Sequence, residues 1–372
     1  MNSIFFINDF DYFYSHRFLL LKELNKCIKV GVACDASLAS EDALKNCKRS
    51  NVQIIHVKNT AKDGLLGKLI QCKSQLDVVK KFNPKNVLFV TLESSVIGMF
   101  ISLLERRTSF FFLITGFGPF FSKNEIKYAI FRWMTFLLIK ISNSRSKYIV
   151  QNTDDNEFLK NKVKNIILIS GNGICTETFR FKKRNTDLPS FLFLSRLVKS
   201  KGVDTFIEAA EKISKNNIKA LFSLGGIYDP LNPESIEPSV LNKIKNHPNV
   251  NYLGAVERKN IVNALHSADI FILGSEREGM PQAILEAAAT GMPIIASDVP
   301  GSRECIKDNG MLFKYGDVNS LIECIQMYIN DTDKVELHGI KSRELIISNF
   351  EIKVITNKYL KILQNSQYLN KR

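Results

Sequence analysis

One stretch of the sequence, residues 271–306, most narrows the folds open to this chain. A short apolar run at 271–273 leads through a loop into a helical segment that Pro281 opens and Gly291 closes, and a second apolar run follows at 293–296. Proline is tolerated in the first turn of a helix because its missing N–H would be unpaired there, and glycine after the last turn adopts the left-handed conformation that ends a helix. The stretch therefore predicts a strand, a loop, a short helix and a second strand.

The same alternation of short apolar runs and helical segments extends over most of the chain. It predicts βαβ units and parallel, doubly wound sheets, that is, an α/β fold. At 372 residues the chain is long enough for two domains, each with its own core. The expected strands lie at 4–7, 29–33, 52–57, 87–90, 110–114, 148–150 and 166–169 in the first half, and at 220–224, 250–253 and 269–273 in the second, with one more ending at Leu194.

Two carboxylates in the opening stretch, Glu278 and Glu286, are candidates for ligand binding. Glu278 follows a strand, at the edge of the sheet where open α/β folds bind ligands, and Glu286 lies about a turn and a half into the helix. Both are expected to face one cleft, where backbone N–H groups around Gly279 and Met280 offer a phosphate site. Hydroxyl groups of a ribose or a hexose are natural donors to such carboxylates. The alternative is that both glutamates are simply solvated.

Residues 278–304, EGMPQAILEAAATGMPIIASDVPGSRE, resemble the E-x7-E signature of the retaining glycosyltransferases of family 4. The resemblance implies that Glu286 holds the ribose of a nucleotide-sugar and that Glu278 is a catalytic residue against the donor sugar. It also implies that the backbone at Gly279, Met280 and Pro281 meets the sugar and the diphosphate. The matching positions are Glu278, Gly279, Pro281, Leu285, Glu286, Ala287, Gly291, Pro293, Gly301 and Glu304.

Two basic residues upstream, Arg196 and Lys201, resemble the RLxxxKG element of the same family. In that element the two cations neutralise the nucleotide diphosphate, so they are counted with Glu278 as catalytic. The chemistry agrees, because guanidinium offers a bidentate fork to phosphate oxygens and ammonium a compact point charge. With these cations present, no metal and no other cofactor is expected. The resemblance also places backbone near Val256 beside the base; taken alone, a basic loop is more often only surface.

The acceptor side is expected in the first half of the chain. Surface-polysaccharide enzymes of family 4 resemble this sequence at Ser15, His16 and Arg17, after the first strand, and at a TGxG segment that contains Gly116 and Gly118. His16 and Arg17 are predicted to face the cleft and to meet the acceptor or its phosphate. The alternatives are a solvated His-Arg pair in a first helical turn and an ordinary glycine turn.

The resemblance implies the GT-B architecture, in which two Rossmann-like domains face each other across a cleft. The expected division is an acceptor-binding domain at 1–184, a nucleotide-sugar-binding domain at 185–349, and a C-terminal helix at 350–372 that crosses back to the first domain.

The net charge of +14 is confined to the first half of the chain. Residues 1–186 contain 29 Lys and Arg against 15 Asp and Glu, whereas residues 187–372 contain 22 of each. Because no nucleic-acid motif is present, this basic half favours an anionic membrane surface or a phosphate-bearing partner, with compositional drift as the alternative. Helix 125–142 is apolar around most of its circumference, which suits either core packing or contact with lipid.

The expected location follows from what the sequence does not contain. No apolar run approaches the roughly 20 residues that span a bilayer, and the N-terminus lacks the features of a signal peptide. The seven cysteines include no C-x2-C pair, which argues against a disulfide framework and a zinc site. A cytoplasmic protein, peripheral on the cytoplasmic face of the inner membrane, is therefore expected.

The predicted activity is retaining transfer of a hexose or N-acetylhexosamine from a UDP-sugar. The acceptor is expected to be a polyprenyl-diphosphate-linked glycan or a glycolipid in surface polysaccharide or lipopolysaccharide biosynthesis. Two alternatives remain open at this point, a nucleotide-sugar epimerase of the same fold and a catalytically silent nucleotide-sugar-binding scaffold.

Overall fold

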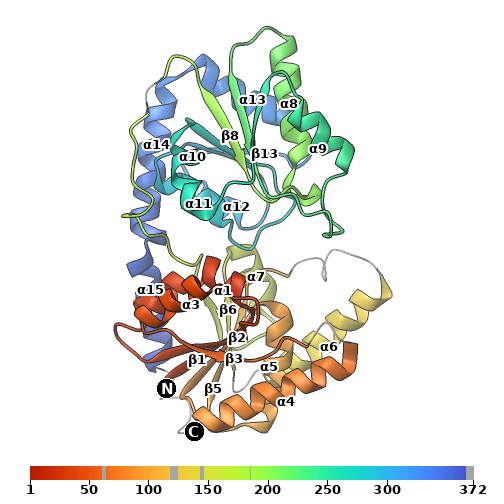
Figure 1. The fold of residues 1–372 in the computed structure, drawn as a ribbon, viewed down its shortest axis with the longest axis vertical. Coiled ribbons are helices and arrows are strands. Elements are labelled where there is room, and N and C mark those ends of the chain that lie inside the picture. The colour runs from red at the N-terminus through yellow and green to blue at the C-terminus, as the bar shows by residue number, and fades with distance from the viewer. Residues whose placement is uncertain (61–63, 118–124, 143–145, 185, 366–372) are drawn as a thin grey trace. The chain divides into compact units, whose positions relative to one another are not determined.

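The computed structural model describes residues 1–60, 64–117, 125–142, 146–184 and 186–365 of the chain. The chain forms two compact units (Figure 1). Unit 1 comprises Met1–Gly173 and Ile352–Arg372, and unit 2 comprises Ile174–Glu351. Among the described residues, none of the helices combines the length and the apolar character that crossing a bilayer requires.

Unit 1 is built on a seven-stranded parallel sheet in the order β3-β2-β1-β4-β5-β6-β7. The order reverses between β1 and β4, which is the arrangement of a doubly wound fold and confirms the predicted class. The strands are β1 (Ser3–Asp9), β2 (Val30–Asp35), β3 (Gln53–His56), β4 (Asn86–Val90), β5 (Ser109–Ile114), β6 (Ser146–Val150) and β7 (Ile166–Leu168).

Helices cover both faces of this sheet, because successive strand residues point to opposite sides. Phe6 and Phe89 belong to one buried cluster, which is covered by α4 (Gly64–Phe82), α5 (Leu92–Leu104), α6 (Ile126–Ser142) and α7 (Thr153–Lys160). Phe5 and Leu88 belong to the cluster on the other face, which is covered by α1 (Phe10–His16), α2 (Phe18–Leu24), α3 (Glu41–Arg49) and α15 (Ile352–Gln364). The helix α15, near the C-terminus, thus packs on the sheet that contains the first strand of the chain, β1.

Unit 2 repeats the plan with a six-stranded parallel sheet in the order β10-β9-β8-β11-β12-β13. Here the order reverses between β8 and β11. The strands are β8 (Ser190–Leu194), β9 (Leu221–Gly225), β10 (Val250–Gly254), β11 (Ile270–Leu273), β12 (Ile294–Ser297) and β13 (Gly310–Phe313). The edge strand β13 was not predicted, because its four residues, GMLF, begin with glycine and are too few to show alternation.

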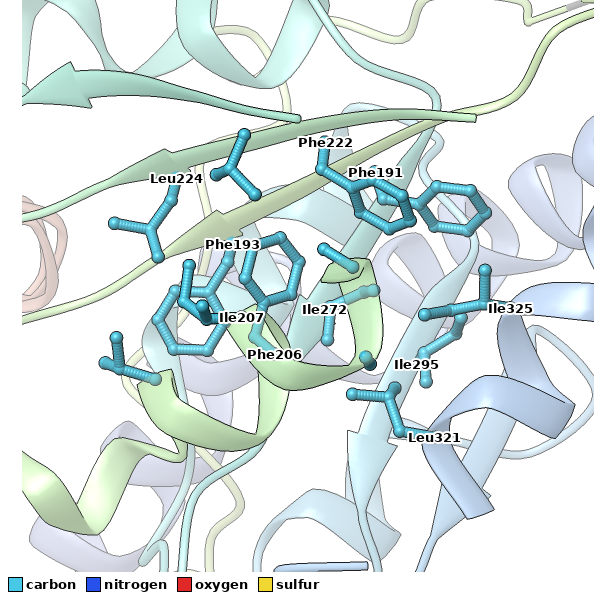
Figure 2. Packing of buried hydrophobic residues seen from close by; sticks show 14 of the residues in the cluster. Phe191, Phe193, Phe206, Ile207, Phe222, Leu224, Ile272, Ile295, Leu321 and Ile325 are labelled. Carbon is cyan, nitrogen blue, oxygen red and sulfur yellow. The ribbon is translucent and has the colours of Figure 1, made fainter. Parts of the chain in front are cut away.

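Two buried clusters lie on opposite faces of the second sheet. Figure 2 shows one of them, in which Phe191, Phe193 and Phe222 of the strands pack with Phe206 of a helix. The other contains Leu192, Phe271 and the inner side of α11. The helices are α8 (Val203–Lys215), α9 (Pro238–Lys245), α10 (Ile261–His266), α11 (Gln282–Ala289), α12 (Ser302–Cys305), α13 (Val318–Asn330), α14 (Asp333–Leu345) and the π-helical η4 (Ile346–Phe350).

The boundary between the units lies at Gly173 and Ile174, earlier in the chain than the predicted position 184. Arg184, the last residue of the predicted first domain, is buried in unit 2 and donates hydrogen bonds to the carbonyl oxygens of Leu265 (3.0 Å) and Thr290 (2.6 Å). A run of basic residues resembles an exposed linker in sequence, but here one guanidinium satisfies the carbonyl groups where helices end.

Candidate functional site

The candidate site lies in unit 2, at the carboxyl ends of β8 and β11, where the strand order reverses. The loops that follow these two strands are held against each other. Gly202 has a φ of +75°, and a Cβ atom there would lie 2.2 Å from the carbonyl oxygen of Gly274. The Glu276 amide donates to the carbonyl oxygen of Ser200 at 2.8 Å. Only a glycine at position 202 permits this close approach of the two loops. The approach places Lys201 against the loop that follows β11.

Lys201 and Glu278 form an ion pair across the two loops. The Lys201 Nζ lies 2.5 Å from the Glu278 Oε1, and the Ser275 hydroxyl donates to the same oxygen at 2.7 Å. The two charged side chains are only 18% and 12% exposed. The structure therefore brings together two of the three residues predicted to be catalytic.

Gly301 packs closely against the backbone of the Glu278 loop. This glycine has a φ of +81°, and a Cβ atom there would lie 2.7 Å from the carbonyl oxygens of Glu278 and Gly279. Any larger residue at position 301 would push the Glu278 loop away from α12, the helix that begins next to it. The match at Gly301 thus reflects a steric requirement of the loop.

Glu286 is held by a residue that the sequence analysis missed. Its carboxylate is 5% exposed, and Oε1 lies 2.6 Å from an Arg258 guanidinium nitrogen and accepts from the Gln282 amide at 3.2 Å. Burial raises the pKa of Glu286, and the contacts with Arg258 and Gln282 oppose that rise. The Arg258 guanidinium also lies 5.6 Å from the centre of the Phe179 ring, within reach of a cation–π contact.

Arg258 follows β10, on the sheet edge where the other site residues lie. The only signal in the sequence was its position shortly after a strand that ends in glycine. Nothing in the spacing between positions 258 and 286 predicts their contact, which depends on the arrangement of strands in the sheet.

In each of the two glutamates, only one carboxylate oxygen, Oε1, makes polar contacts with the described residues of the protein. Oε1 of Glu278 meets Lys201 and Ser275, and Oε1 of Glu286 meets Arg258 and Gln282. Within the described parts of the chain, no side chain or amide donates to either Oε2. Each carboxylate therefore keeps an oxygen that can accept from a ligand hydroxyl.

The remaining predicted donor-side residues lie on loops at the carboxyl ends of strands in the same sheet. Arg196 is exposed on the loop after β8, and no described carboxylate forms an ion pair with it. Val256 lies beside Gly225. A Cβ atom added at Gly225 would lie 3.1 Å from a methyl group of Val256. Pro281 is the N-cap of α11, and Met280 packs on the cluster beneath that helix.

In unit 1 the structure separates the two neighbours His16 and Arg17. His16 is partly exposed at the end of α1, hydrogen-bonded to the Ser15 hydroxyl (2.7 Å) and stacked on Tyr12 with ring centres 4.7 Å apart. Arg17 is fully buried beside Tyr359 of α15. Arg17 was predicted to face the cleft and to meet the acceptor, but it is not exposed, because the turn between α1 and α2 places this residue beside the last helix.

Of the glycine pair predicted on the acceptor side, Gly116 lies two residues after the end of β5 and has a φ of +135°. Gly118 lies outside the described residues. Among the described residues, no group of three His, Cys, Asp or Glu side chains is placed to hold a metal ion.

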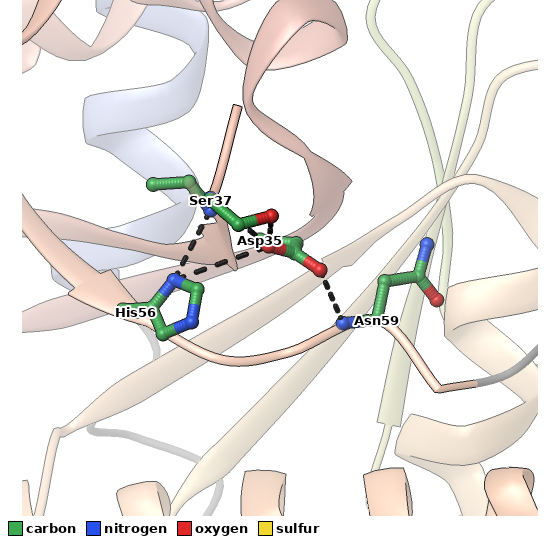
Figure 3. Close-up of polar contacts among 5 residues, drawn as sticks. Asp35, Ser37, His56 and Asn59 are labelled. Atoms are coloured by element: carbon green, nitrogen blue, oxygen red, sulfur yellow. Dashed lines mark hydrogen bonds and ion pairs between the residues drawn. The ribbon is translucent and has the colours of Figure 1, made fainter. Parts of the chain in front are cut away.

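A second polar cluster lies at the carboxyl ends of β2 and β3 in unit 1 (Figure 3). Asp35 accepts from the backbone amides of Ser37 (3.1 Å) and Asn59 (2.8 Å) and lies 4.0 Å from the His56 ring. Partial burial opposes ionisation, but these hydrogen bonds outweigh it and lower the pKa of Asp35. Asp35 thus ties the two loops together beside a pocket of about 160 Å³ that Asp9, Phe10 and Leu38 also line.

Two doubly wound parallel sheets of this order define the GT-B fold of glycosyltransferases. Anabaena HepE in complex with UDP superposes with a TM-score of 0.77 over 98% of this chain and 100% of its own, at 16% identity. Residues 176–346, which lie within unit 2, match the family Glycosyl transferases group 1. The chain thus carries a group 1 glycosyltransferase domain, which confirms the predicted resemblance to glycosyltransferases.

Two curated relatives extend the similarity beyond this domain. The N,N'-diacetylbacillosaminyl-diphospho-undecaprenol alpha-1,3-N-acetylgalactosaminyltransferase of Campylobacter jejuni is 29% identical over 77% of this chain and 78% of its own length. The capsular polysaccharide biosynthesis glycosyltransferase CapM of Staphylococcus aureus is 23% identical over 86% of this chain and 87% of its own. The chain is therefore similar to bacterial glycan-building glycosyltransferases over both units.

Proposed function

We propose that the protein is a retaining glycosyltransferase that moves a hexose or N-acetylhexosamine from a UDP-sugar to a lipid-linked acceptor. The observation that carries this proposal is the arrangement of Glu278 and Glu286. Each carboxylate is fixed through Oε1 by a cation and a neutral donor of the protein, while Oε2 receives no contact from the described residues. Two fixed acceptors at one sheet edge suit a ligand with many hydroxyl groups.

In the proposed complex, Glu286 accepts from the ribose and Glu278 from the donor sugar. Arg196 and Lys201 neutralise the charge that grows on the diphosphate as the glycosidic bond breaks. An ammonium group has three N–H donors, so Lys201 can hold a phosphate oxygen without releasing Glu278. The backbone at Gly279, Met280 and Pro281, before α11, would meet the donor sugar and the diphosphate, and Val256 would border the base. Donor binding then needs no divalent metal.

The proposed donor and acceptor are supported by what similar proteins bind and act on. The HepE structure contains UDP, and the name of the Campylobacter jejuni relative describes a diphospho-undecaprenol acceptor. We infer a polyprenyl-diphosphate-linked glycan or a glycolipid as the acceptor, approached from unit 1 near His16 and Gly116. The product would belong to a bacterial surface polysaccharide, and the protein would work at the cytoplasmic face of the inner membrane.

The first experiment measures thermal shifts of the full chain with UDP, GDP, ADP, TDP and CMP, each with and without magnesium. A ligand that binds only the folded state stabilises it by about 2.7 kcal/mol at 100 times its dissociation constant. We expect a shift with UDP that magnesium does not change. A shift with GDP instead would contradict the UDP donor, and no shift with any nucleotide would contradict the transferase assignment.

Variants then test the roles of the named residues. Glu286→Ala and Arg196→Ala are each expected to lose most transfer activity while remaining folded. Lys199→Ala is the matched control for Arg196, because Lys199 lies on the same loop and is paired with the exposed Glu237 at 2.7 Å. Wild-type turnover in either site variant would refute the site assignment. Detection of an epimerised UDP-sugar without any acceptor would instead identify an epimerase.

A further inference from the structure

The outer surface of α6 carries a stripe of exposed apolar side chains. Its members are Ile126, Ile130, Trp133, Leu137 and Ile141, which are 40 to 80% exposed. At about 100° per residue these positions fall within an arc of roughly 80° on the helix. The opposite side of α6 is buried against the sheet through Leu138 and Ile139. The stripe therefore is a second apolar face that the fold of unit 1 does not use.

Two neighbouring helices add to this surface. α4 exposes Leu65, Leu66, Leu69 and Ile70, and α5 exposes Phe100 and Leu104. α5 packs against both α4 and α6, and all three cover the same face of the seven-stranded sheet (Figure 1). We call the outer side of these three helices the α4–α6 face.

The helices on the other face of the same sheet behave differently. Among the described residues of α1, α2, α3 and α15, no large apolar side chain is exposed. Exposed apolar residues are common singly on protein surfaces, but a gathering on one face marks an interaction site. Within unit 1, the α4–α6 face thus differs from the opposite layer of helices in its exposed apolar side chains.

The charge of this region is strongly basic. Residues 64–142 contain eleven Lys and Arg and four Asp and Glu, and the sequence of α6 contains no acidic residue. Lys68, Lys73 and Lys140 are exposed on the same helices as the apolar side chains. Exposed apolar residues with basic neighbours complement an anionic lipid surface, where the apolar side chains enter the interface and the cations meet the headgroups.

We propose that the α4–α6 face is a membrane-docking surface that lies on an anionic lipid bilayer, with the α6 stripe around Trp133 inserted into the interface. An α6 of 17 residues is about 25 Å long and lies in the plane of such a surface. This inference deepens the proposed function, because it identifies the part of the chain that holds the enzyme at the membrane where a lipid-linked acceptor resides.

The chain provides its own probe, because Trp133 is its single tryptophan and is 67% exposed. Purified protein is mixed with vesicles of phosphatidylglycerol and phosphatidylethanolamine, without nucleotide or acceptor. We expect the tryptophan emission to shift to shorter wavelength and to be quenched by brominated acyl chains. Vesicles of phosphatidylcholine alone are expected to give a much smaller response, because the cations then lack anionic headgroups.

Matched variants locate the surface. Ile130→Glu and Leu69→Glu are expected to weaken vesicle binding roughly tenfold or more, since each replaces an inserted aliphatic side chain by a charge. Leu337→Glu is the control, because Leu337 is a similarly exposed leucine on α14 of unit 2 and is expected to change nothing. Circular dichroism and thermal unfolding without ligand establish that each variant remains folded.

Three results would overturn the proposal. The first is an unchanged Trp133 emission with anionic vesicles, and the second is equal loss of binding in Leu337→Glu. The third is a blue-shifted emission without lipid that depends on protein concentration, with a dimer in sedimentation, because the face would then join two copies of the chain. None of these results bears on UDP binding, so the docking surface and the proposed transferase activity can fail separately.

Discussion

Replacement of Arg258 by methionine tests how strongly Arg258 stabilises the buried carboxylate of Glu286. Methionine retains an apolar stem against Phe179 but removes the guanidinium that lies 2.6 Å from Glu286 Oε1. Gln282 remains as the only other described donor to this carboxylate, at 3.2 Å. The variant therefore leaves a buried carboxylate with one neutral hydrogen bond.

The expected loss of stability depends on pH, and its sign follows from the pKa. Burial raises the folded-state pKa of Glu286 above its ordinary value, in spite of Arg258. An acid with a raised pKa destabilises the fold at pH values above that pKa, and the penalty disappears as the pH falls toward the unfolded value. Arg258→Met removes the main opposing contact and so increases the penalty.

The magnitude follows from the exposure of the two partners. Removal of one partner from a fully buried ion pair costs about 3 to 5 kcal/mol, but the Arg258 side chain is 53% exposed and the pair is partly screened. We expect unit 2 to lose about 1 to 3 kcal/mol of unfolding free energy near pH 8 and much less near pH 5. Calorimetry at the two pH values measures this, with unit 2 identified as the transition that UDP shifts.

Nucleotide affinity is expected to change in the opposite direction with pH. An ionised Glu286 is the better acceptor for a ribose hydroxyl, so UDP binding by Arg258→Met should strengthen as the pH rises, while stability falls. Lys259→Met is the control, because the neighbouring Lys259 pairs only with the exposed Glu257 at 2.7 Å and should show neither effect. A pH-independent loss of stability, or UDP binding equal to wild type at both pH values, would refute the reasoning.

Three further changes probe the framework of the site. Arg196→Met should leave the calorimetric transitions of the protein unchanged and weaken UDP binding relative to uridine, because the side chain is exposed and unpaired with any described carboxylate; equal weakening for both ligands would contradict a phosphate contact. Gly202→Ala should destabilise unit 2 by about 2 kcal/mol or more, since a Cβ atom meets the Gly274 carbonyl and the φ is left-handed. A smaller loss in calorimetry would mean that the two loops separate easily. Arg184→Met should cost about 3 kcal/mol in the same assay, because it leaves buried carbonyl groups without donors; wild-type stability would contradict this structural role of Arg184.

Much of the fold could be predicted from the sequence because its signals are local. Short apolar runs separated by helical segments indicate parallel strands, and α11 could be delimited from Pro281 and Gly291 alone, which flank it. What failed required knowledge of contacts at a distance. The basic run that ends in Arg184 has the composition of a linker, yet its guanidinium binds carbonyl groups more than 80 positions away in the chain.

The site shows the same division between local and distant information. Glu278, Glu286 and Lys201 were predicted because a family motif contains them, whereas Arg258 was missed and Arg17 was assigned to the wrong environment. Both failures concern arginines, whose long side chains reach partners that sequence spacing does not indicate. Arg258 follows β10 and reaches Glu286 in the helix after β11, although β9 and β8 lie between these two strands in the sheet. Arg17 lies beside Tyr359 of the last helix.

The pairing of charges explains how the proposed site for a doubly charged diphosphate remains folded before the ligand arrives. Lys201 is balanced by Glu278, and the carboxylate of Glu286 is balanced by Arg258, so neither partly buried loop carries an isolated charge. Arg196 lies in solvent, where an unpaired cation costs little. A nucleotide-sugar would then add its phosphates to cations already oriented and its hydroxyls to the two unused carboxylate oxygens. Binding in this arrangement requires no existing ion pair to break, which favours a site formed in advance over one that the ligand must assemble.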